Sequence, residues 1–73
     1  MKKYEYINLR DTDGDIEIIT RKELKEMFPT LKLPQFRNLE RIVFKGEEIE
    51  FFFKTKKMVY KKYHGNWALE YIT

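Results

Sequence analysis

The sequence predicts an α+β domain: a small antiparallel sheet of hairpins, with four to six strands, and one short helix on one face. Two observations lead to this prediction. Three pairs of β-prone segments are each joined by a short turn that contains glycine, and one capping-box sequence precedes a short apolar stripe. With 73 residues, of which 42% are apolar, the chain suffices for one core, so residues 1–73 are predicted to form a single domain.

The first predicted hairpin joins residues 3–10 to residues 16–19, two segments rich in tyrosine and isoleucine. The pair Asp13-Gly14 between them is typical of the centre of a two-residue hairpin turn. Such a turn places Leu9 opposite Ile18, and strand alternation then puts four aliphatic side chains on one side. These four residues are Ile7, Leu9, Ile16 and Ile18.

A helix is predicted to begin after Thr20, because Thr20 and Glu23 have the spacing of a capping box. Pro29 ends this helix, since the residue before a proline is disfavoured in the helical region. The helix therefore covers residues 21–28, about two turns, and should pack on one face of the sheet. Its predicted apolar stripe consists of Leu24, Met27 and Phe28.

A second hairpin is predicted in residues 41–45 and 48–54, with Gly46 at the first position of a two-residue turn. This register separates a core-facing side from a mostly polar side. The predicted core-facing residues are Ile42, Phe44, Ile49, Phe51 and Phe53.

The last strand pair is predicted in residues 58–63 and 67–72, on either side of His64-Gly65-Asn66. An alternative remains open for the second of these segments. Asn66 is a residue type that caps helices, so residues 67–72 could instead form a short C-terminal helix.

Residue types that carry covalent chemistry are scarce in this chain. It lacks cysteine and serine and has a single histidine, His64, in a predicted turn. We therefore predict no enzyme activity and no cofactor. A small domain without disulfides is typical of a reducing compartment, so we predict a cytoplasmic location. No apolar run approaches the length of a membrane span, so no membrane association is predicted.

Alternating acidic residues suggest a calcium loop at first sight. Asp11, Asp13, Asp15 and Glu17 place oxygen ligands on every second residue, as such loops do. The glycine, however, follows the second aspartate, and Lys22 occupies the position that requires a bidentate glutamate. We interpret the segment as a turn and predict no metal site.

The size of the predicted sheet suggests that the protein is a homodimer. An eight-residue helix is about 12 Å long, whereas five strands side by side measure about 20 Å or more. One helix leaves apolar side chains exposed, and such a surface usually marks an association site. The candidate dimer or partner surface consists of Phe52, Tyr60, Trp67, Leu69 and Tyr71. The leading hypothesis is a non-enzymatic interaction module, a homodimer that binds a protein partner.

An alternative function is nucleic-acid binding by the C-terminal strands. The formal net charge is +3, and five lysines with no acid lie between residues 51 and 69, interleaved with aromatic residues. Strand alternation puts Lys57, Lys61 and Tyr63 on one side, so these are the candidate nucleic-acid contacts, whereas Lys62 points to the other side with Tyr60. Lysines that solvate an edge strand are the simpler interpretation.

The segment Lys-Glu-Leu-Lys-Glu-Met-Phe-Pro, residues 22–29, follows the first predicted hairpin in a short chain rich in lysine, glutamate and tyrosine that lacks serine and cysteine. In length, composition and element order, the whole chain resembles the small uncharacterised YopT-like prophage proteins of Bacillus. This resemblance implies a compact protomer with one helix and several strands that forms homodimers and has no known activity. It carries over no functional residues.

Overall fold

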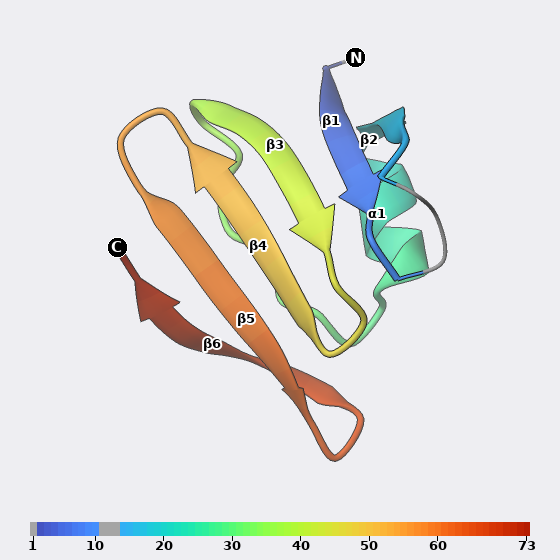
Figure 1. Ribbon diagram of the computed structural model, residues 1–73, viewed down its shortest axis with the longest axis vertical. Helices are drawn as coiled ribbons and strands as arrows, with labels where there is room; N and C mark the ends of the chain where they lie inside the picture. Colours follow the sequence, from blue (N-terminus) through green and yellow to red (C-terminus); the bar gives the residue numbers. More distant parts are fainter. Residues whose placement is uncertain (1, 11–13) are drawn as a thin grey trace.

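Six strands form one mixed sheet in the computed structural model, which describes residues 2–10 and 14–73 (Figure 1). The strand order is β2-β1-β3-β4-β5-β6. Neighbouring strands are antiparallel except β1 and β3, which are parallel. The elements along the chain are β1 (Lys3–Asn8), β2 (Ile16–Thr20), α1 (Arg21–Met27), β3 (Leu39–Phe44), β4 (Glu48–Phe53), β5 (Lys57–Tyr63) and β6 (Asn66–Ile72).

The predicted α+β architecture is wrong, because the structure is a small β-rich fold. Helix α1 has seven residues and buries only Leu24, too little to form a layer of its own. Residues 28–38, here called the crossing segment, contribute three further buried side chains, Phe28, Leu31 and Phe36. This segment contains two prolines and runs behind the sheet in Figure 1 without helical structure. It leads into β3 parallel to β1, so the predicted all-antiparallel sheet is also wrong.

The core lies between one face of the sheet and the layer made by α1 and the crossing segment. Aromatic rings meet there in edge-to-face geometry, with ring centroids 5.0 Å apart for Phe28 and Phe44 and 5.4 Å apart for Phe51 and Tyr60. The buried cluster consists of Tyr6, Ile19, Leu24, Phe28, Leu31, Phe36, Ile42, Phe44, Ile49, Phe51, Phe53, Met58 and Tyr60.

The predicted register of the first hairpin is wrong. Ile18 lies opposite Glu5, not opposite Leu9, and Ile7 pairs with Ile16. Tyr6, only 1% exposed, and Ile19 face the core, so the four aliphatic residues predicted to share one side of the hairpin lie on the side away from the core. Both faces of this hairpin carry large apolar side chains, and alternation alone therefore could not choose between them. The predicted turn at Asp13 and the acidic positions 11 and 13 lie outside the described residues.

The capping box and the second hairpin are confirmed, and the helix ends at Met27, one residue earlier than predicted, with one exception in its apolar stripe. Thr20 Oγ1 accepts from the Glu23 backbone N–H at 3.2 Å and the Glu23 carboxylate accepts from the Thr20 N–H at 2.9 Å, as a capping box requires. Phe44 pairs with Ile49 and Ile42 with Phe51 in the second hairpin. The exception is Met27, which is exposed although the predicted apolar stripe of the helix includes it.

Residues 66–72 form strand β6, so the alternative of a C-terminal helix is wrong. Tyr63 and Asn66 pair across a two-residue turn made of His64 and Gly65. Both turn residues have positive φ, 50° and 82°, as a type I′ hairpin turn demands. No helix of the described residues is long and apolar enough to cross a membrane.

Candidate functional site

The face of the sheet opposite α1 and the crossing segment is here called the open face. The central row of cross-strand neighbours on it, from β2 to β6, consists of Ile16, Ile7, Val43, Glu50, Val59 and Tyr71. The next row consists of Ile18, Glu5, Arg41, Phe52 and Lys57. The open face is therefore apolar at its β1–β2 end and charged across its middle.

The apolar end of the open face is here called the aliphatic patch and consists of Ile7, Leu9, Ile16 and Ile18. Leu9, Ile16 and Ile18 are 48%, 58% and 56% exposed. Ile7 and Ile16 are direct cross-strand partners, and Leu9 continues the ladder through its N–H, which donates to the Phe44 carbonyl at 2.8 Å. Sequence reasoning placed these residues on one side of the hairpin but did not identify that side as an exposed surface. The available signal was that the opposite side of the same strands, with Tyr4, Tyr6 and Ile19, is equally apolar.

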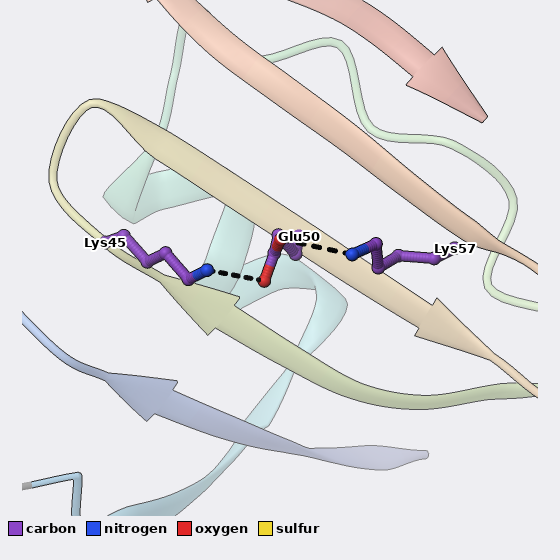
Figure 2. A network of polar contacts seen from close by, with 3 residues as sticks. All are labelled: Lys45, Glu50 and Lys57. Atoms are coloured by element: carbon purple, nitrogen blue, oxygen red, sulfur yellow. Dashed lines mark hydrogen bonds and ion pairs between the residues drawn. The ribbon is translucent and has the colours of Figure 1, made fainter. Parts of the chain in front are cut away.

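A buried carboxylate marks the middle of the open face (Figure 2). Glu50 Oε1 lies 3.2 Å from Lys45 Nζ, and Glu50 Oε2 lies 3.5 Å from Lys57 Nζ. The Glu50 side chain is 7% exposed and stands between Val43 and Val59, its buried cross-strand neighbours. Two cations from different elements thus neutralise one buried charge, which holds the β3–β4 turn and β5 against β4.

The five residues of the predicted dimer surface do not form one surface. Phe52 and Tyr71 lie on the open face, whereas Tyr60 is buried in the core. Trp67 packs against Phe28 from the core side, with ring centroids 5.9 Å apart. Leu69 is 46% exposed and pairs with Tyr60 of β5.

An irregularity in β6 separates two of these residues that the sequence places together. Leu69 and Tyr71 are two positions apart and would share a face in a regular strand. Tyr71 pairs with Val59, however, and Leu69 pairs with Tyr60, the next residue of β5. The extra residue between them is a β-bulge that turns Leu69 to the core side and Tyr71 to the open face.

The three candidate nucleic-acid contacts lie together on the open face, as alternation predicted, but each faces a carboxylate. Lys57 pairs with Glu50, and Lys61 lies across from Glu48. The Tyr63 hydroxyl donates to Glu70 at 2.6 Å, and this hydrogen bond raises the pKa of Tyr63. The positive charge expected from the sequence is therefore balanced locally by acidic neighbours.

Metal ligands do not gather in the part of the chain that the structure describes: no three histidine, cysteine, aspartate or glutamate side chains are placed to hold an ion. The acidic segment from Asp11 to Glu17 lies partly outside these residues, so the absence of a calcium site at Asp11, Asp13 and Asp15 stays a prediction.

The fold and the open face define a small β-rich domain whose most distinctive exposed feature is an apolar surface. No family model, curated protein or solved structure matches the chain. The similarity to YopT-like prophage proteins therefore stays a hypothesis based on composition and element order.

Proposed function

We propose that this protein is a non-enzymatic cytoplasmic interaction module that forms a homodimer and binds a protein partner. The observation that carries the proposal is the aliphatic patch. Removing apolar side chains of this size from water contributes about 1.5–3 kcal/mol each, and clustered apolar side chains on a small protein usually mark an association surface.

Two copies related by a twofold axis bury the same patch on each other, which is the commonest symmetry of small oligomers. The pattern of charge on the open face supports this arrangement. Arg41 and Glu5 are cross-strand neighbours beside the patch, so each copy presents both signs to the other. The absence of cysteine and the exposed turn position of the only histidine support a non-enzymatic, cytoplasmic role.

Sedimentation equilibrium tests this proposal. The wild type should sediment as a dimer at tens of micromolar, and Ile18→Glu should sediment as a monomer. Leu69→Glu is the matched control, because Leu69 has similar exposure but lies on the other side of the sheet. A monomeric wild type would refute the dimer. A dimer disrupted by Leu69→Glu but not by Ile18→Glu would place the interface on β6 and overturn the assignment to the aliphatic patch.

A further inference from the structure

The topology gathers basic residues at one end of the sheet. β1 and β3 are parallel and therefore begin at the same end, where the antiparallel strands β2 and β4 finish. Helix α1 follows β2 directly, so its first turn lies at this end too. Figure 1 shows the start of β1, the start of β3 and the β4–β5 turn together at the upper end of the sheet. The Lys54 N–H donates to the Asn38 carbonyl at 3.0 Å and joins that turn to the start of β3.

Three adjoining surface grooves of about 410, 630 and 250 Å³ run along this end. Lys2, Tyr4 and Arg21 line both the first and the second groove. Arg37 and its neighbours Gln35 and Asn38 line both the second and the third. Because these three grooves share lining residues, they are here together called the cationic groove. Its basic residues are Lys2, Arg21, Lys22, Lys25, Arg37 and Lys56.

None of the described residues that line the cationic groove is acidic. Glu23, on α1 beside the groove, already has a partner, since its carboxylate accepts the Thr20 N–H. This backbone hydrogen bond lowers the pKa of Glu23 and keeps its charge at the helix start. The open face differs from this groove, because both of its candidate nucleic-acid-binding lysines, Lys57 and Lys61, lie beside a carboxylate. The described lining of this groove therefore carries basic residues without an acidic one, a pattern that attracts anions.

Two aromatic side chains that contact each other, Tyr4 and Phe36, line the cationic groove. Tyr4 and Phe36 meet edge to face with ring centroids 4.9 Å apart, and Tyr4 is half-buried. The Arg21 guanidinium lies 4.5 Å from the centre of the Phe36 ring and donates to the Pro34 carbonyl at 2.6 Å. These two contacts fix the position of the Arg21 guanidinium in the protein without a ligand. The side-chain amides of Gln35 and Asn38 add hydrogen-bond donors and acceptors to the groove.

We infer that the cationic groove binds single-stranded nucleic acid. A row of cations without acids matches a linear chain of phosphates, which supplies most of the sequence-independent affinity of such complexes. The half-buried Tyr4 ring and the side-chain amides of Gln35 and Asn38 match unpaired bases, which stack on rings and form hydrogen bonds through their edges. A base-paired duplex hides those edges and ring faces, so the single strand is the better fit.

Fluorescence anisotropy with a short labelled oligothymidine tests the inference. Wild-type affinity should fall steeply between about 50 and about 200 mM salt. Arg37→Gln combined with Lys56→Gln removes two exposed cations from the groove and should weaken binding tenfold or more. The same double variant should make the logarithmic salt dependence shallower by about 1.4, or about 0.7 for each phosphate that is no longer neutralised.

The matched control is Lys61→Gln combined with Lys62→Gln, which makes the same change in net charge on β5, away from the groove. It should change affinity by less than about twofold, because phosphate contacts act locally. Equal weakening of binding by both double variants would show that affinity depends only on net charge and would overturn the inference. A wild-type protein that does not bind the oligothymidine would also overturn it. Heparin or duplex DNA competing as well as unlabelled oligothymidine would show a general polyanion site and would overturn the assignment to single strands.

Discussion

Glu50 Oε1 lies 3.2 Å from Lys45 Nζ on a face of the sheet that neither helix α1 nor the crossing segment covers. Lys57 Nζ approaches the other carboxylate oxygen at 3.5 Å. The carboxylate is buried by its strand neighbours Val43 and Val59, and both lysines remain partly exposed. The network therefore combines one desolvated charge with two cations that keep contact with water.

Glu50→Gln should lower the free energy of unfolding by about 1.5–3 kcal/mol, because the buried position loses its charge-assisted contacts with two lysines. Urea denaturation measures this difference. Glu48→Gln is the control, since Glu48 is half-buried on the same strand and lies opposite Lys61, and it should cost less than about 1 kcal/mol. Equal small losses in both variants would show that the Lys45–Glu50–Lys57 network contributes nothing measurable.

Adjacent isoleucines in β2 distinguish the two faces of the first hairpin. Ile19→Ala should destabilise the fold by about 2–5 kcal/mol, because Ile19 lies in the core cluster. Ile18→Ala should cost the isolated protomer only about 0.5 kcal/mol, because Ile18 is exposed on the aliphatic patch. Thermal and urea denaturation at micromolar protein concentration measure both values. A larger loss at Ile18 than at Ile19 would show that the side of the hairpin with Ile7, Ile16 and Ile18 faces the core instead.

The Tyr63–Glu70 hydrogen bond should make stability depend on pH in the alkaline range. This bond is the main reason that the pKa of Tyr63 is raised above its ordinary value of 10.0. A raised folded-state pKa means that the stabilisation is complete below pH 10.0 and is lost as the pH rises through the folded-state pKa.

The stability difference between wild type and Tyr63→Phe isolates this effect, because burial also raises the pKa of Tyr60 in both proteins. The difference should be constant from neutral pH to about pH 10 and should shrink above it. Denaturation at a series of pH values measures it. A difference that grows with alkalinity would have the wrong sign for this hydrogen bond.

A substitution in the two-residue turn between β5 and β6 should increase the stability of the protein. His64 has φ 50° and Gly65 has φ 82°, and asparagine is preferred over histidine at the first of these positions in a type I′ turn. His64→Asn should raise the free energy of unfolding by about 0.5 kcal/mol. Gly65→Ala should lower it by about 1–2 kcal/mol through backbone strain alone, since a β-carbon at Gly65 meets nothing within 4 Å. Thermal denaturation that ranks the two variants in the opposite order would contradict this description of the turn.

Local sequence determined most of the secondary structure of this protein. The capping box at Thr20 and Glu23, the stop at Pro29 and the registers around Gly46 depend on groups a few residues apart, so they were readable from the chain alone. The same holds for the common side of Lys57, Lys61 and Tyr63, which follows from strand alternation.

Tertiary structure decided the faces and the candidate sites. Tyr6 and Ile19 rather than Ile7 and Ile18 face the core, because that side of the hairpin meets α1 and the crossing segment, and both sides are apolar enough for either choice. The parallel pairing of β1 with β3 joins residues far apart in the sequence, which no local pattern encodes. That pairing also brings Lys2, Arg21 and Arg37 to one end of the sheet, where three basic residues separated by at least fifteen positions line one groove.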